Sequence, residues 1–281
     1  MKVVFCTPTY TRPHPAYLAA LEAAVPAVEA AGIEHQAVYE VGNPYISAAR
    51  ATMTRKALDW GADAMIYIDH DVAFRPQDLV KLIETDGDVV AGTYRYKNDL
   101  AKEEYMGALI ERPDGRPQGR PKDGALLAHS VPAGFLKVTR NGIRKIMAAH
   151  PELLMGRREA PAVDLFHHGA HDFVWYGEDM AFCRRWREMG ERIWLVPDLD
   201  LDHWHGDVCF KGNYHRFMQS YSLTAVRDEP GRIALKCEVC GHDKPAPGTT
   251  ILGQWICDEC YYRRNVEPPP GYGNKTTKDA A

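Results

Sequence analysis

The sequence predicts an α/β protein with a mostly parallel sheet flanked by helices, followed by a small cysteine-rich module. Over residues 1–96, β-prone apolar runs alternate with stretches of helical periodicity, from a first strand through three helices to a fourth strand. This alternation is typical of a doubly wound, Rossmann-like sheet built from right-handed crossovers. Near the C-terminus, two C-x-x-C pairs indicate a separate module that a metal would stabilise.

Apolar spacing and stop signals locate the first elements. Gly32 and Gly61 are natural ends for the first two helices, and Pro76 is a natural start for the third. We expect strands over residues 2–6, 34–41, 65–68 and 88–96, and helices over 17–28, 45–60 and 76–85.

The pattern becomes irregular after Tyr96. A Pro/Gly-rich loop over residues 112–124 is long for a compact domain, and such loops are often functional or mobile. The remaining elements that we expect are strands over 105–111, 136–138 and 192–196, and helices over 141–150 and 177–189.

Composition excludes several classes of protein. Of the 281 residues, 45% are apolar and 26% are charged, which is ordinary for a globular protein. The formal net charge of -4 argues against a strongly basic nucleic-acid binder. Neither a membrane span nor a signal peptide is evident, so we expect no membrane partner and a cytoplasmic location. The boundaries that we expect are 1–226 for the large domain, 227–262 for the cysteine module and 263–281 for a disordered tail.

Two carboxylates follow the third expected strand. Asp69 and Asp71 are two positions apart, so their side chains leave the strand on the same side. Ligands bind at this end of open α/β sheets, and paired carboxylates suit a hard divalent cation that holds substrate phosphates. The alternative is an ordinary polar turn, in which Asp is common.

Further groups of the types that bind metals or move protons occur late in the chain. Glu178 and Asp179 open an expected helix, where they are candidates for a general base or simply helix caps. His203 and His205 follow an expected strand in a segment rich in aspartate, and are either metal ligands or strand-end polar residues.

These motifs, taken in order, resemble those of a known family. Thr7-Pro8-Thr9 follows the first strand, Ala48-Ala49-Arg50 lies on the second helix, and Ile68-Asp69-His70-Asp71 ends the third strand. Pro132-Ala133-Gly134-Phe135, the segment from Gly177 to Phe182 and a late histidine complete the set. The set, over residues 1–215, is similar to glycosyltransferases of the GT-A fold, close to the family 2 type and to small bacteriophage enzymes.

The resemblance implies a role for each matching residue. The donor nucleotide would contact Thr7, Pro8, Thr9, Arg12, Glu40, Arg50 and Asp69, and the sugar and acceptor would face Gly134 and Phe135. Asp69, Asp71 and His205, with His203 as the alternative histidine, would hold Mn2+ or Mg2+. Asp179, next to Glu178, would act as the general base of an inverting enzyme. Glu40 departs from the family pattern, in which Asp is more usual.

The cysteine module has the spacing of a four-thiolate Zn2+ site, or zinc ribbon. Cys237, Cys240, Cys257 and Cys260 form two knuckles separated by a short segment that is too small to build a core without metal. Two redox-active pairs are the alternative. Positive and negative residues balance after Arg227, so an interaction role is favoured over direct DNA binding.

The function that the sequence predicts is sugar transfer from a nucleotide sugar, UDP-linked, to a hydroxyl. The zinc module suggests a macromolecular acceptor, such as hydroxymethylated phage DNA or a protein. Two alternatives stay open at this point. One is a nucleotidyltransferase acting on a sugar phosphate, and the other is a non-enzymatic zinc-ribbon binding protein on a GT-A-like scaffold.

Overall fold

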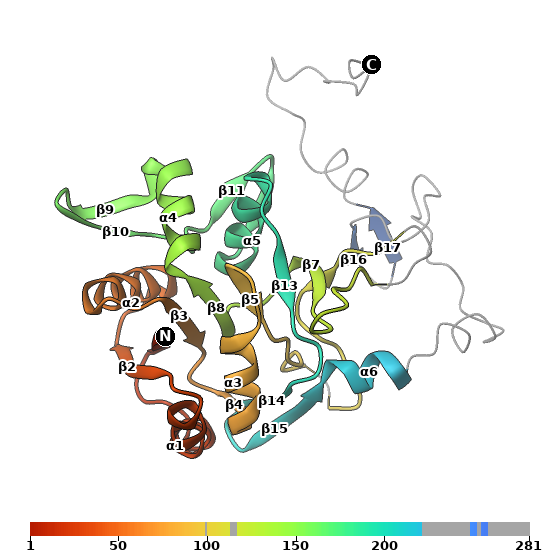
Figure 1. Cartoon of the computed structure of the whole chain (residues 1–281). Helices are drawn as coiled ribbons and strands as arrows, with labels where there is room; N and C mark the ends of the chain where they lie inside the picture. Colours follow the sequence, from red (N-terminus) through yellow and green to blue (C-terminus); the bar gives the residue numbers. More distant parts are fainter. Residues whose placement is uncertain (99, 113–116, 221–247, 252–253, 258–281) are drawn as a thin grey trace, which may run out of the picture. The chain divides into compact units, whose positions relative to one another are not determined.

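The computed structural model describes residues 1–98, 100–112, 117–220, 248–251 and 254–257 (Figure 1). The chain divides into two compact units, 1–221 and 222–281. The described part of the second unit is the antiparallel hairpin of β16 (Gly248–Ile251) and β17 (Gln254–Cys257). Cys237, Cys240 and Cys260, and the side chain of Cys257, lie outside the described residues, as does the segment expected to be a disordered tail.

An eight-stranded sheet forms the centre of the first unit, which confirms the predicted α/β class. Six of its strands run in one direction, and β8 and β7 run against them. In spatial order the strands are β2 (Glu34–Val41), β1 (Lys2–Thr9), β3 (Ala64–Ile68), β8 (Phe135–Thr139), β5 (Val89–Ala91), β13 (Ile193–Leu195), β7 (Leu126–Ser130) and β6 (Ala108–Leu109).

Helices cover both faces of the sheet, because alternate strand residues point to opposite sides. Val3 and Phe5 of β1 join one apolar cluster with α1 (Pro15–Ala30) and α3 (Pro76–Glu84). Val4 and Cys6 join the other, with residues of α2 (Ile46–Trp60), α4 (Arg140–Ala149) and α5 (Glu178–Glu188). A strand buried on both faces reads as a continuous apolar run, which is why β1 and β3 were evident in the sequence.

The strand expected over residues 88–96 is shorter than predicted. β5 ends at Ala91, and at Gly92 a Cβ atom would overlap side-chain atoms of Leu201 and Leu199. The chain then leaves the sheet and passes the end of β3, where Tyr94 approaches Asp69. Antiparallel β8 takes the place beside β3 and separates β3 from β5.

A second, three-stranded sheet was not expected from the sequence. In it, β14 (Asp200–His205) pairs with both β15 (Val208–Asn213) and β4 (Val72–Phe74). Its register sets His203 opposite Val72, the residue after Asp71. Because β4 follows the acidic pair directly, this sheet brings a late segment of the chain to the end of β3.

Smaller elements complete the first unit. They are the hairpin of β9 (Leu154–Arg157) and β10 (Ala160–Val163), the hairpin of β11 (Gly169–His171) and β12 (Val174–Tyr176), the 3-10 helix η1 (Pro151–Leu153) and α6 (Tyr214–Ser220). None of the helices that the structure describes combines the length and apolar character needed to cross a membrane.

Candidate functional site

The acidic pair lies where β3 leaves the sheet. The five residues of β3 are fully buried, and the Asp69 amide donates to the carbonyl of Gly134, 3.0 Å away. The Val72 amide closes a turn on the Asp69 carbonyl at 3.1 Å, after which β4 begins. The turn leaves the Asp69 and Asp71 side chains 26% and 17% exposed, so both carboxylates are accessible to a ligand.

Arg50 holds Asp69 from the neighbouring helix. Its side chain is 1% exposed and donates to Asp69 Oδ1 at 2.9 Å and to Glu178 Oε1 at 3.1 Å. Burial alone would lower the pKa of this guanidinium, but the Asp69 and Glu178 carboxylates offset it and the pKa lies above its ordinary value. Arg50 therefore ties the end of β3 to the first turn of α5.

Gly134 fixes the other side of Asp69. Its amide donates to Tyr94 Oη at 3.1 Å, and a Cβ atom here would overlap both Tyr94 Oη and Asp69 Oδ2. The prediction for Phe135 needs correction. Its side chain is fully buried and packs on Phe74 with ring centroids 5.2 Å apart, so it faces the core and not a sugar.

Asp71 is held by a lysine and a histidine. Lys97 Nζ donates to Asp71 Oδ2, and His203 Nε2 lies 3.7 Å from Asp71 Oδ1. Burial would raise the pKa of Asp71, but the His203 and Lys97 groups more than offset it and hold the pKa well below its usual range. Asp71 is therefore ionised at neutral pH.

The structure places His203, and not the favoured His205, beside the acidic pair. His203 is 8% exposed, whereas His205 is exposed near the end of the β14–β15 hairpin. His203 Nδ1 lies 2.8 Å from the Arg95 carbonyl oxygen, which can only accept a hydrogen bond. With Nδ1 protonated, a neutral His203 would carry its lone pair on Nε2, where a cation shared with Asp71 could bind it. Metal-binding histidines are oriented by this kind of hydrogen bond.

The helix α5 begins with the two carboxylates of Glu178 and Asp179. Glu178 accepts from Arg50, and Asp179 Oδ1 accepts from the Met180 amide at 2.7 Å. Burial, followed by the negative charge of Glu178, raises the pKa of Asp179 above its ordinary value. These two effects outweigh the helix N-terminus, which favours the ionised carboxylate.

The charges around the acidic pair do not balance. Arg50 links Asp69 and Glu178, Asp179 is next to Glu178 and is influenced by the charge of Asp69, and Lys97 pairs with Asp71. Among the described residues, these contacts set the charges of Arg50 and Lys97 against four carboxylates, a local deficit of two positive charges when His203 is neutral. One divalent cation would supply that charge.

The residues expected at the nucleotide lie along one edge of the sheet. β1 lies between β2 and β3, and its register pairs Pro8 with Glu40, so both lie near the strand end that leads to Asp69. Glu40 also accepts from Lys56 Nζ of α2 at 3.1 Å.

The local structure corrects one expectation at this edge. Strand β1 continues to Thr9 and does not end at Cys6. The Thr7 side chain is fully buried and hydrogen-bonds Tyr17 Oη at 2.6 Å, so it points into the core. Thr9 is 5% exposed, and its Oγ1 has no hydrogen-bond partner among the described residues. Thr9 is therefore better placed than Thr7 to offer a hydroxyl to a ligand.

Arg12 lines a cavity of about 590 Å³ beside this edge. His14 forms part of its wall, stacks on Trp204 with ring centroids 4.9 Å apart, and donates from Nε2 to the Gly206 carbonyl oxygen, 3.0 Å away. His70, the residue between the two aspartates, lines the same cavity. The cavity therefore reaches from the exposed Arg12 side chain to the D-x-D turn.

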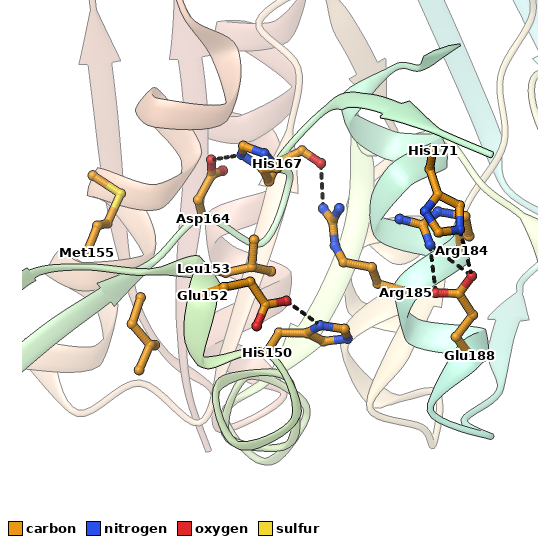
Figure 2. A pocket seen from close by; sticks show the side chains of 11 residues that line it. His150, Glu152, Leu153, Met155, Asp164, His167, His171, Arg184, Arg185 and Glu188 are labelled. Carbon is orange, nitrogen blue, oxygen red and sulfur yellow. Dashed lines mark hydrogen bonds and ion pairs between the residues drawn. The ribbon is translucent and has the colours of Figure 1, made fainter. Parts of the chain in front are cut away.

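A second cavity, of about 500 Å³, lies away from the acidic pair (Figure 2). Figure 2 shows its polar side chains paired with one another: His150 with Glu152, His167 with Asp164, and Arg184 with Glu188. Arg185 donates to the carbonyl of His167 at 2.6 Å. Because these groups are engaged internally and no residue of the D-x-D turn lines it, whereas His70 lines the Arg12 cavity, this cavity is not the candidate site.

Two residues near the acidic pair, Lys97 and Tyr94, were not predicted from the sequence. Lys97 lies in a charged stretch with no motif, 26 positions from Asp71. Tyr94 is 2% exposed, yet its hydroxyl lies 3.5 Å from Asp69 Oδ2. No local signal marks either residue, because each depends on the path that the chain takes after β5.

The donor set fits a divalent cation in its chemistry, although it is not preassembled. Across the described ranges, no three His, Cys, Asp or Glu side chains are already grouped closely enough to hold a metal ion. Asp69 and Asp71 offer oxygen ligands, His203 Nε2 offers a nitrogen, and the local charge deficit favours a cation.

Comparison with solved structures finds weak likenesses. A protein of the virus STIV is 15% identical, covering 73% of this chain and 86% of that one, with a TM-score of 0.43. The catalytic domain of Drosophila β1,4-galactosyltransferase 7, solved with xylobiose, is 12% identical, covering 76% and 73%, with a TM-score of 0.41. GalNAc-T7, solved with UDP, GalNAc and Mn2+, is 12% identical with a TM-score of 0.39; the match covers 73% of this chain but 44% of GalNAc-T7.

Neither a protein-family model nor a curated protein matches the sequence. The case for a function therefore rests on the geometry of this chain's own residues.

Proposed function

We propose that this chain is a metal-dependent glycosyltransferase that moves a sugar from a nucleotide sugar, UDP-linked, to a hydroxyl acceptor. One observation carries the proposal: four carboxylates and a histidine lie around the end of β3, where Arg50 and Lys97 are the Arg and Lys side chains of the described residues that pair with them. Such a site would repel a diphosphate unless a divalent cation were bound.

Asp69, Asp71 and His203 are the residues that would hold Mn2+ or Mg2+. We choose His203 over His205 because it is buried beside Asp71, with its Nε2 3.7 Å from Asp71 Oδ1 and its Nδ1 oriented by the Arg95 carbonyl. The cation would act as a Lewis acid that neutralises the leaving nucleoside diphosphate. Thr9, Glu40 and Arg12 lie along the adjoining sheet edge and would contact the nucleotide.

Asp179 is the proposed general base. Its raised pKa brings it closer to that of an acceptor hydroxyl under attack, which makes a carboxylate a more effective proton acceptor at neutral pH. Glu178, fixed by Arg50, contributes to that shift and positions the first turn of α5. Direct attack by the acceptor would invert the configuration of the sugar. A macromolecular acceptor, DNA or protein, stays a prediction that depends on the zinc module.

The first test is a thermal-shift screen with UDP, GDP, CDP and dTDP, each with and without Mn2+. Binding to the native state alone at about 100 times Kd adds about 2.7 kcal/mol, or roughly 5–10 °C for a domain of this size. We expect one diphosphate to give a shift that requires Mn2+. Asp71→Asn should abolish it. Asp86→Asn, at an exposed pair with Lys122, is the matched control and should keep it.

The reaction itself separates the alternatives. A glycosyltransferase releases the nucleoside diphosphate, whereas a nucleotidyltransferase releases pyrophosphate. Asp179→Asn should keep the Mn2+-dependent shift and lose roughly 10²–10⁴-fold in transfer, the usual contribution of a positioned base. A folded protein that shows no shift with any diphosphate would refute the proposal and leave the scaffold interpretation.

A further inference from the structure

The position proposed for the cation is already in contact with an ammonium group. Lys97 Nζ lies on Asp71 Oδ2, while His203 Nε2 lies 3.7 Å from Asp71 Oδ1. Asp71 and His203 are two of the three residues assigned to the metal. A cation that uses Asp71 must therefore compete with Lys97 for that carboxylate.

Lys97 can leave this position more easily than Arg50 can leave Asp69. Arg50 is 1% exposed, bridges two carboxylates and lies 4.9 Å from the Phe166 ring centroid. Lys97 is 26% exposed and makes its contact with a single ammonium at the end of a flexible stem. Rotation of that side chain releases Asp71, whereas release of Asp69 would leave the buried Arg50 guanidinium without one of its two carboxylate partners.

A bound divalent cation and a bound diphosphate act on Lys97 in opposite directions. The cation takes its carboxylate partner and repels the ammonium. The diphosphate brings negative oxygens to the same place, and an ammonium within reach of them makes a strong charge-assisted hydrogen bond. The loss of the Lys97–Asp71 contact is therefore offset only when the diphosphate is bound.

We propose that Lys97 couples the binding of the divalent cation to the binding of the donor diphosphate. Without donor, its ammonium opposes the cation at Asp71; with donor, the ammonium transfers to the diphosphate. This inference rests on the proposed function and adds a residue and a binding dependence to it. Because linkage is reciprocal, the factor by which UDP changes the affinity for Mn2+ equals the factor by which Mn2+ changes the affinity for UDP. Replacement of Lys97 must therefore reduce both factors equally.

The experiment is a complete binding cycle on the full chain. Mn2+ affinity is measured by the EPR signal of free Mn2+, with and without UDP. UDP affinity is measured by calorimetry, with and without Mn2+. The proteins compared are the wild type, Lys97→Met, Lys97→Arg and the control Lys122→Met. The Lys122 side chain is 74% exposed and forms a surface pair with Asp86.

Lys97→Met should bind Mn2+ alone about tenfold more tightly and, when saturated with Mn2+, should bind UDP about tenfold more weakly. Lys97→Arg keeps a positive charge and should retain most of the coupling. Lys122→Met should behave as the wild type. The opposite signs for the two ligands separate this effect from general loss of structure, which would weaken both.

Three results would overturn the inference. The first is a Lys97→Met protein that binds Mn2+ alone no more tightly than the wild type. The second is UDP binding that needs Lys97 but no metal, in which case Lys97 is itself the counter-charge and the metal part of the proposed function fails. The third is a wild type that binds neither ligand, which refutes the proposed function together with this inference.

Discussion

The two halves of the acidic pair are held in different ways. Asp69 is fixed by Arg50, the Gly134 carbonyl and the Tyr94 hydroxyl, all from buried parts of the fold. Asp71 is held by Lys97, which lies in a loop and is partly exposed, and is approached by His203. The difference indicates that one carboxylate is part of the scaffold, while the other exchanges its partner when a ligand binds.

Arg50→Met should have the largest effect on stability. Removing one partner of a buried ion pair leaves uncompensated charges, here Asp69 and Glu178, and costs about 3–5 kcal/mol. Urea unfolding measures this loss. The control, Lys56→Met on the same helix, removes an ion pair with Glu40 in which the lysine side chain is 52% exposed, and should cost about 1 kcal/mol or less. Equal losses for both variants would contradict the idea that Asp69 is part of the scaffold.

Much of the arrangement around Asp69 could be predicted from the sequence. Asp69 follows a run of buried strand residues, Arg50 lies on the helix before it, and Glu178 opens a helix. Strand ends and helix starts carry local signals, and parallel strands bring their ends to one edge. The structure brings these three residues together with contacts of 2.9 and 3.1 Å.

The contacts of Asp71 with Lys97 and His203 could not be predicted, because they depend on pairing between distant segments. His203 and His205 share one face of β14, so alternation along the strand cannot distinguish them. The register of β14 with β4 sets His203, and not His205, opposite Val72. Lys97 reaches Asp71 only because β5 ends at Ala91, which the packing around Gly92 determines. Thr7 and Phe135 fit the family pattern, but their side chains point into the core.

His203→Asn should weaken Mn2+ binding in the presence of UDP by roughly 10–100-fold, the loss seen when even an outer partner of a metal ligand is removed. His205→Asn, two residues away and exposed, is the control and should leave the affinity unchanged. An EPR titration of Mn2+ measures both. A larger loss for His205→Asn would reverse the assignment and move the cation away from the Asp71–His203 contact.

Gly134→Ala should destabilise the fold less than Arg50→Met, and it tests how rigidly Asp69 is held. The added Cβ would overlap Tyr94 Oη and Asp69 Oδ2, and overpacking of this kind costs about 1–3 kcal/mol. Tyr94→Phe removes one of the overlapped oxygens, so the double variant should be less destabilised than the sum of the two single variants. Urea unfolding of the four proteins gives that coupling energy. Simple additivity would mean that the side chains around Asp69 move to accommodate the extra atom. Asp69 would then be held no more rigidly than Asp71.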